Sequence, residues 1–114
     1  MAGNIIHIVL ARLPDAPKGT RGISLFIVPK YLPDTNGDAG EFNQVSVGSL
    51  EDKMGIKASA TCVMNFDAST GYLIGPANKG LHCMFTFMNT ARIGTGLQGS
   101  CAAELSFQGA LTYA

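Results

Sequence analysis

The stretch Lys53-Met54-Gly55-Ile56-Lys57-Ala58-Ser59 lies between two segments in which apolar and polar residues alternate as in β-strands. By itself this heptapeptide predicts a turn, because Gly55 permits the backbone to reverse and the two lysines keep the loop in water. The small Ala58-Ser59 end allows close packing. Its position matters more, since strand-like segments surround it and a long apolar helix follows. This order of elements predicts an α+β fold.

The length and composition of the chain fit one domain with incomplete burial. The chain has 114 residues, of which 46% are hydrophobic and 14% charged. A chain of this size buries a limited share of its surface, so we expect some apolar surface to remain uncovered. The formal net charge is zero. The chain therefore has no net attraction to nucleic acid or to an anionic membrane, and self-association is favoured.

The three cysteines, Cys62, Cys83 and Cys101, predict reduced side chains rather than disulfides. Their number is odd and no pair has the spacing of metal ligands, so we expect no metal site and a cytoplasmic location. The apolar run at residues 5–10 is too short for a secretory signal, and no run approaches the roughly 20 residues of a membrane span. The chain opens directly on strand-like sequence, and we interpret it as part of a longer protein.

Alternating apolar residues predict five β-strands, at residues 5–13, 22–30, 42–50, 60–66 and 71–75. The first two strands are apolar on both faces, so we expect them to be covered on both sides. Prolines and glycines mark residues 14–21 as a hairpin connection and residues 31–41 as a loop.

From residues 76–78 onward the apolar spacing becomes that of a helix, which we expect to continue through Leu111. Apolar side chains occupy nearly all sides of it, and Arg92 is the only charged residue between Lys79 and Glu104. A helix this apolar needs other helices around it, and the sequence contains no other. We expect its partners to come from missing sequence or from other copies of the chain.

Three glycines, Gly94, Gly96 and Gly99, weaken this helix by about 1 kcal/mol each relative to alanine. Glycines in such a helix indicate that another backbone or a ligand comes close. Their spacing superficially matches a phosphate-binding loop. That motif needs a strand just before it, whereas these glycines lie inside a helix, so we reject a nucleotide-binding fold.

Few side chains are candidates for chemistry. His7 lies in an apolar strand and is expected to be a packed histidine with hydrogen-bonded ring nitrogens. His82 is expected at the surface or at an interface. The aspartates and glutamates lie in loops or at strand ends and form no pair for acid–base catalysis. Arg92 differs, because a cation on a buried helix needs an anionic partner, which is either a structural carboxylate or a ligand.

Four segments together resemble the flavin-dependent acyl-CoA dehydrogenase family. They are Lys18-Gly19-Thr20-Arg21-Gly22-Ile23-Ser24-Leu25-Phe26-Ile27-Val28, the stretch 53–62, Gly75-Pro76-Ala77-Asn78-Lys79-Gly80-Leu81 and Met88-Asn89-Thr90-Ala91-Arg92-Ile93-Gly94. The resemblance covers nearly the whole chain. Some features are similar to the bacterial branch that acts on 3-methylmercaptopropionyl-CoA and similar thioesters.

The resemblance implies a fragment of a larger, homo-oligomeric enzyme. Residues 1–76 are similar to part of the family's middle domain, an antiparallel β-barrel or sandwich. Residues 77–114 are similar to the first helix of its C-terminal bundle. The implied reaction oxidises an acyl-CoA to the trans-2-enoyl-CoA. A carboxylate base removes the α-proton, the β-hydride passes to FAD, and electrons leave to an electron-transferring flavoprotein. We expect the isolated chain to be inactive and not to retain FAD.

The resemblance also implies two substrate-binding residues. Arg92 matches the family's helix arginine beside the acyl-CoA. Asn89, one turn earlier, matches a position that often holds an aspartate contacting the CoA moiety, although asparagine carries no charge. Ala91 matches a position where some members place the catalytic glutamate, and alanine cannot accept a proton. The base is therefore expected beyond Ala114, and the cofactor-binding residues stay unassigned.

Two other interpretations stay open. A non-enzymatic β-rich interaction module requires no site, but it leaves Arg92 on an apolar helix unexplained. An acyl-CoA-binding or acyl-CoA oxidase-like relative would have the same segments as a dehydrogenase. The presence or absence of a base beyond Ala114 would discriminate between these.

Overall fold

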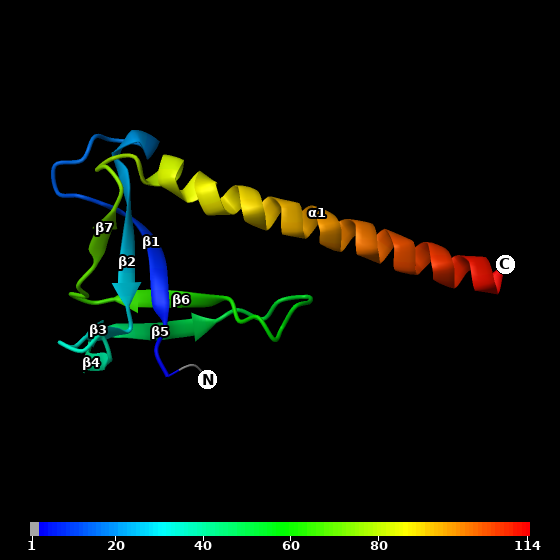
Figure 1. Cartoon of the computed structure of the whole chain (residues 1–114), viewed down its shortest axis with the longest axis horizontal. Coiled ribbons are helices and arrows are strands. Elements are labelled where there is room, and N and C mark those ends of the chain that lie inside the picture. Colours follow the sequence, from blue (N-terminus) through cyan, green and yellow to red (C-terminus); the bar gives the residue numbers. More distant parts are fainter. Residues whose placement is uncertain (1–2) are drawn as a thin grey trace.

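The computed structural model describes residues 3–114 and shows three small antiparallel sheets followed by one long helix (Figure 1). The first sheet has the strand order β1 (Ile6–Arg12), β2 (Ile23–Pro29), β7 (Tyr72–Ile74). The second pairs β3 (Tyr31–Pro33) with β4 (Ala39–Phe42), and the third pairs β5 (Val45–Leu50) with β6 (Cys62–Phe66). A short 3-10 helix, η1 (Thr20–Gly22), precedes β2, and α1 (Gly80–Tyr113) follows β7. The predicted α+β class is confirmed.

The prediction of a loop at residues 31–41 is wrong in part, because β3 and β4 pair there as a hairpin. The Asp34 carboxylate shapes its tip by accepting hydrogen bonds from the backbone N–H groups of Asn36 and Asp38, at 2.8 and 2.9 Å. The two strands have three and four residues. Both strands contain or flank prolines and glycines, which favoured a loop over a strand in the prediction.

The single strand expected over residues 42–50 is divided at Asn43, which is buried. Its amide nitrogen donates to the carbonyl oxygens of Pro29 at 2.7 Å and Thr70 at 2.9 Å. Its amide oxygen accepts from the backbone N–H of Thr70 at 2.7 Å. Gln44 then takes a left-handed backbone with φ of 54°. Asn43 therefore ties the β4–β5 link to the end of β2 and to the segment before β7.

The loop at residues 53–59 reverses the chain in a different way from the prediction. The residue with a left-handed backbone is Ile56, with φ of 53°, rather than Gly55. The ammonium group of Lys53 donates to the carbonyl oxygen of Ser59. This lysine therefore closes the loop instead of only extending into water.

The start of α1 packs against β2. The backbone N–H of Asn78 donates to the Ser24 hydroxyl oxygen at 2.9 Å, and Ser24 is completely buried. A Cβ atom on Gly80 would lie 2.4 Å from the carbonyl carbon of Ser24, so only glycine fits without a shift. Lys79 is the N-cap residue of α1. The helix thus begins where the sequence changes, in direct contact with the sheet.

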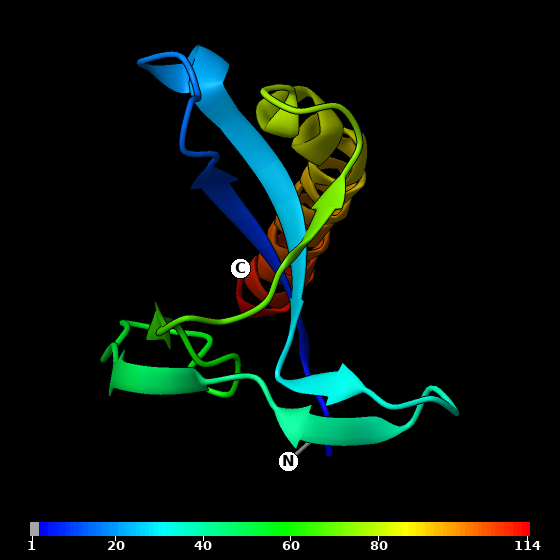
Figure 2. The ribbon, with the colours of Figure 1, turned by 90° about the vertical axis from the view of Figure 1, so that its left-hand side faces the viewer.

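Beyond this contact α1 runs away from the sheets (Figures 1 and 2). It has 34 residues, which corresponds to about 51 Å. Every residue from 89 to 114 is exposed. The radius of gyration is 19.2 Å, whereas a compact chain of this length would have about 13 Å. The apolar helix has no helical partner within the described residues.

Candidate functional site

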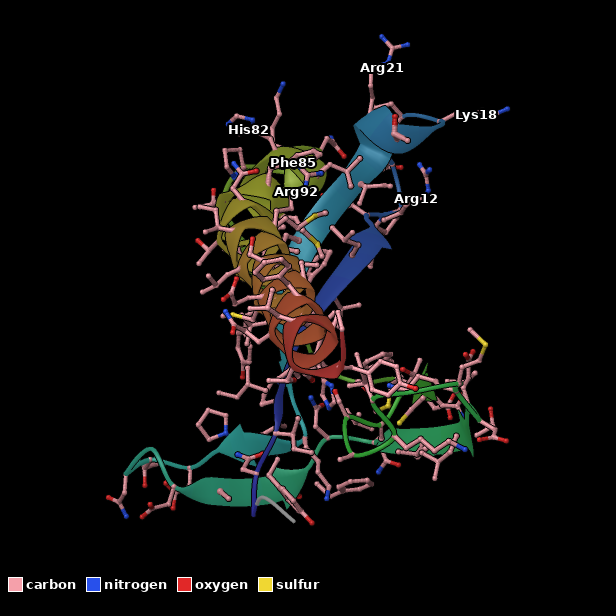
Figure 3. All side chains as sticks on the ribbon, turned by 90° about the vertical axis from the view of Figure 1, so that its right-hand side faces the viewer. Arg12, Lys18, Arg21, His82, Phe85 and Arg92 are labelled. Carbon is pink, nitrogen blue, oxygen red and sulfur yellow. The ribbon has the colours of Figure 1, made fainter. Side chains whose placement is uncertain are left out.

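Helix α1 presents the two predicted substrate-binding residues on one face. Asn89 and Arg92 are three positions apart, so their side chains lie on neighbouring turns. The guanidinium carbon of Arg92 lies 5.3 Å from the centroid of the Phe85 ring, within cation–π range (Figure 3). Phe85 lies one further turn toward the start of the helix, and all three side chains are exposed. The face therefore combines a cation, an amide and an aromatic ring.

Arg92 is exposed in this chain, and the burial expected for its helix stays a prediction for the longer protein. Nothing in residues 3–114 covers α1 at this level. The only ion pair among the described residues joins Lys57 to Asp52 at 2.8 Å, in solvent. A structural carboxylate for Arg92 is therefore absent from residues 3–114, and its guanidinium remains available to an anion or a carbonyl oxygen.

Arg92 and Asn89 can recognise a ligand but cannot transfer a proton at neutral pH. A guanidinium donates up to five hydrogen bonds in a fixed plane and stays charged. An amide both donates and accepts. Ala91, between them in sequence, carries no titratable group. Their face of α1 can therefore bind and orient a ligand, while any proton acceptor must lie elsewhere.

The two histidines lie away from this face. His7 is half-buried and packs edge to face on Phe66, with ring centroids 5.7 Å apart and planes at 82°. That contact confirms a packed histidine, but its ring accepts and donates no hydrogen bond within residues 3–114, contrary to expectation. His82 is exposed, as predicted, on the first turn of α1 (Figure 3).

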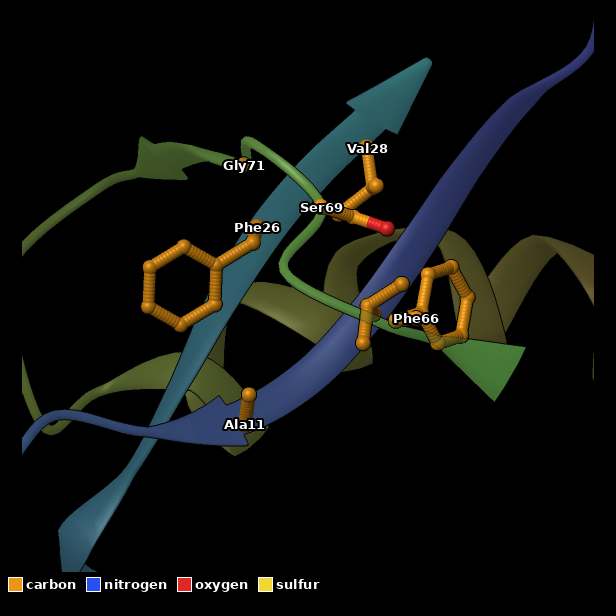
Figure 4. Close-up of a pocket in the computed structure, with 7 residues that line it drawn as sticks. Ala11, Phe26, Val28, Phe66, Ser69 and Gly71 are labelled. Atoms are coloured by element: carbon orange, nitrogen blue, oxygen red, sulfur yellow. The ribbon is translucent and has the colours of Figure 1, made fainter. Parts of the chain in front are cut away.

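Four open pockets lie around the first sheet, and all are mainly apolar; the smallest of them, about 230 Å³, borders the β3–β4 hairpin. One of about 320 Å³ is enclosed by β1, β2 and the segment from β6 to β7, with Phe26, Val28 and Phe66 in its lining (Figure 4). A second of about 360 Å³ lies between the start of β1 and the β5–β6 hairpin. A third of about 400 Å³ lies between that sheet and the start of α1. Arg92 and Asn89 line none of them.

The described residues do not fit a complete FAD. FAD combines an apolar ring system with a charged diphosphate, and apolar side chains could flank only the ring. Among the pockets around the first sheet, Lys30 is the only Lys or Arg, and it lies in the second pocket. A diphosphate would need several N–H donors or cations around it. These residues therefore do not form the cofactor's site by themselves.

Other site classes have no support in the described part of the chain. No group of three or more His, Cys, Asp or Glu side chains in residues 3–114 is placed to hold a metal ion. No helix there is both long enough and apolar enough to cross a membrane. All three cysteines are free thiols, as predicted, and Cys101 is exposed.

Sequence reasoning missed the contact that places this site. Ser24 and Asn78 fix the start of α1 on β2 and hence the direction in which the helix presents Arg92. A signal was present, since Ser24 is the one polar residue in the apolar run of residues 23–28. A lone hydroxyl in a buried strand needs a hydrogen-bond partner. The sequence did not reveal that the partner lies 54 residues later.

Comparisons with known proteins give consistent results. The 3-methylmercaptopropionyl-CoA dehydrogenase of Ruegeria pomeroyi is 50% identical over 114 residues, covering 100% of this chain and 19% of that protein. A butyryl-CoA dehydrogenase of Syntrophomonas wolfei is 41% identical over 118 residues, covering 96% and 19%. The solved structure of Bd2924 in its apo form has a TM-score of 0.66 and 31% identity, covering 77% of this chain and 16% of that one. No family model matches the chain.

The chain therefore belongs to the acyl-CoA dehydrogenase family, as its sequence segments indicated. The similarity to the Ruegeria pomeroyi protein extends over every residue of the chain. The chain spans about a fifth of the length of these relatives, 19% in both cases. It corresponds to a segment of such a protein.

Proposed function

We propose that this chain is a segment of an FAD-dependent enzyme that oxidises an acyl-CoA to the trans-2-enoyl-CoA. The observation that carries the proposal is the 50% identity to 3-methylmercaptopropionyl-CoA dehydrogenase along the whole chain. In the complete enzyme FAD supplies the acceptor for the substrate's β-hydride. The segment itself contributes scaffold and substrate-binding groups, with the base beyond Ala114.

The proposal divides the chain at residue 76. Residues 1–76 are part of the middle β-domain, and residues 77–114 are the first helix of the C-terminal bundle. Two features support this boundary. β7 ends at Ile74 and α1 begins at Gly80, and all strands of the described residues lie before it. The exposed apolar surface of α1 is what a bundle helix shows without its neighbours.

In this proposal Arg92 and Asn89 bind the acyl-CoA. The guanidinium donates to an oxygen of the thioester substrate, and the Asn89 amide hydrogen-bonds to the CoA moiety. In the complete protein other helices would cover α1, and the removal of water would strengthen both contacts. Phe85 would hold the Arg92 side chain along the helix through its ring, which reduces the freedom lost on binding.

Partners and location belong to the proposal as well. The parent enzyme passes its electrons to an electron-transferring flavoprotein and assembles as a homo-oligomer in the cytoplasm. The free thiols of all three cysteines are in keeping with a reducing compartment. The apolar, uncovered surface of α1 is in keeping with assembly.

Substitution of Arg92 in the longer protein tests the function. Arg92→Gln is expected to lower kcat/KM for acyl-CoA about tenfold to a hundredfold, because a hydrogen bond to a charged group contributes about 1.5–3 kcal/mol. Arg92→Lys should recover only part of it, since a lysine cannot donate in a fork. The measurement is reduction of an artificial electron acceptor by acyl-CoA substrates of different chain lengths.

The matched control is Lys57→Gln, which also removes one exposed positive charge but lies in the loop between β5 and β6. It should leave kcat/KM unchanged. An Arg92→Gln enzyme with undiminished kcat/KM would refute the assigned role. Acyl-CoA binding without any electron transfer to the acceptor would favour the acyl-CoA-binding relative over the dehydrogenase.

The isolated 114-residue chain provides a second test. After incubation with FAD and gel filtration it should show no stoichiometric flavin absorbance, because its described residues form no complete cradle for the diphosphate. A yellow protein with one flavin per chain would contradict this.

A further inference from the structure

Charge is unevenly distributed along the chain although the net charge is zero. We define the basic end as Arg12, Lys18, Arg21 and Lys79. Its only acidic neighbour in residues 12–21 is Asp15, so four cations face one anion. We define the acidic hairpin as β3, β4 and their turn, with Asp34, Asp38 and Glu41. Residues 31–42 contain no Lys or Arg, so the hairpin carries three uncompensated carboxylates.

The two charged regions lie at opposite ends of the β-sheet part. The loop before β2, with η1, lies at one end, and the β3–β4 hairpin lies at the other (Figure 1). Arg12, Lys18 and Arg21 are close to the start of α1, where His82 also lies (Figure 3). The remainder of α1 leaves sideways between them (Figure 1). Neither end is therefore covered by the helix.

The basic end is a built surface rather than a loose loop. The Arg12 guanidinium donates to the carbonyl oxygens of Pro17 at 2.8 Å and Gly19 at 2.6 Å, which closes the loop before η1. A Cβ on Gly22 would lie 1.9 Å from the Pro17 carbonyl oxygen, so the backbone packs closely there. Both acceptors are uncharged carbonyl oxygens, so these contacts do not neutralise the positive charge of Arg12. Lys18 and Arg21 remain exposed on a fixed loop.

The acidic hairpin is equally well defined. Its Asp34 carboxylate is held by two backbone N–H groups at the turn. Asp38 and Glu41 form no ion pair within residues 3–114 and are exposed. Lys30 precedes the hairpin, but its ammonium group lies 5.3 Å from the centre of the Tyr31 ring. The hairpin tip therefore projects net negative charge.

We propose that the acidic hairpin of one copy of this chain binds the basic end of a second copy. The two surfaces carry opposite charges of equal size, which both steers encounter and fixes orientation. Lys18, Arg21 and Lys79 line neither the pockets around the first sheet nor the one on α1. All three are exposed, so they are open to a projecting partner such as the acidic hairpin.

This contact is head to tail, so the first copy of a pair keeps a free basic end and the second keeps a free acidic hairpin. Such heterologous contacts extend into open chains unless the rotation closes a ring. The inference does not rest on the proposed enzymatic function. Its energy comes from exposed charges, so it is weak and strongly sensitive to salt. We expect the association constant to fall at least about fivefold between roughly 0.02 M and 0.2 M salt.

A charge swap tests the pairing. Lys18→Glu with Arg21→Glu reverses the basic end, and Asp38→Lys with Glu41→Lys reverses the acidic hairpin. Each double variant alone places like charges opposite each other and should not associate head to tail. A mixture of the two should associate again, because the unchanged acidic hairpin of the first meets the unchanged basic end of the second, and their two reversed surfaces also carry opposite charges. Arg12 and Asp34 are left intact because they hold the two loops.

The readout is NMR of one isotope-labelled double variant titrated with the other at low salt. Amide shifts are expected in residues 18–21 and 34–41, and circular dichroism checks that each variant folds. The matched control, Lys57→Glu with Arg92→Glu, makes the same net charge change as Lys18→Glu with Arg21→Glu, but outside both regions, and should still associate as the natural chain does. The proposal is overturned if mixing restores nothing, if salt has no effect, or if the shifts lie on α1. Pyrophosphate binding at residues 18–21 without any response to the second copy would also overturn it.

Discussion

Asn43 and Ser24 are the residues on which the arrangement of the sheets depends. They are the two buried polar side chains among the described residues, and both join segments far apart in the sequence. A buried amide or hydroxyl is tolerated because its hydrogen bonds are satisfied. The apolar core by contrast is small, with Leu25, Val28 and Val45 as its buried members in the described chain. Polar contacts therefore carry an unusual share of the specificity of this fold.

Replacement of Asn43 is the first prediction at this scale. Asn43→Ala removes the partners of two carbonyl oxygens and one N–H group. Each buried group left unsatisfied costs about 1–3 kcal/mol. We expect the free energy of unfolding to fall by about 2 kcal/mol or more, measured by urea denaturation of the 114-residue chain followed by circular dichroism.

Asn36→Ala is the control for Asn43. Asn36 lies at the exposed tip of the acidic hairpin and uses its backbone N–H, not its side chain, to reach Asp34. The change in unfolding free energy should stay within about 0.5 kcal/mol. Equal destabilisation by both substitutions would show that the buried amide has no special role.

At the scale of elements, the long regular segments and the short strand β7 could be predicted from sequence, whereas the short strands β3 and β4 could not. Apolar alternation identified β1, β2 and β6 to within two residues at each end, and helical spacing identified α1. The hairpin of β3 and β4 was missed because its short strands contain or flank Pro33, Asn36-Gly37 and Gly40, which are typical of loops. The break at Asn43 was missed because its hydrogen-bond partners are 14 and 27 residues away.

Two glycines of one helix should respond to alanine in opposite directions. Gly80→Ala places a Cβ within 2.4–2.7 Å of the Ser24 and Leu25 backbone, so the start of α1 must move off β2. We expect a loss of about 1–3 kcal/mol. Gly94→Ala meets nothing within 4 Å and lies in the helix interior. It should gain about 1 kcal/mol of helix stability.

Circular dichroism and urea denaturation of the two variants measure this difference. Their matched chemistry is the control, because the same methyl group is added at both positions. A gain in stability from Gly80→Ala would mean that the contact between α1 and β2 does not hold the helix in place.

At the scale of the whole molecule, residues 3–114 supply only part of the candidate site. The face of Asn89 and Arg92 could be predicted because helical spacing and family resemblance both place them one turn apart. The burial of these two side chains in a longer protein could not be predicted in detail, because the groups that would cover α1 are not among residues 3–114. Apolar side chains of the long helix, such as Ile93, Leu97 and Leu105, are exposed to water. Their exposure is unfavourable in free energy compared with burial. The same chain therefore has different constraints alone and inside a longer protein.

Substitution of Leu105 distinguishes the isolated chain from the longer protein. It is 76% exposed in this chain, so Leu105→Lys should change the unfolding free energy of the 114-residue chain by less than about 0.5 kcal/mol. In the longer protein the proposed bundle buries this position, and a lysine there loses apolar burial and adds an unpaired charge. A loss of about 3 kcal/mol or more is expected there. Glu104→Gln, one residue earlier, is the control and should be nearly neutral in both. If Leu105→Lys were equally harmless in both proteins, α1 could not be a bundle helix, because a buried face cannot accept a charge that an exposed face accepts freely.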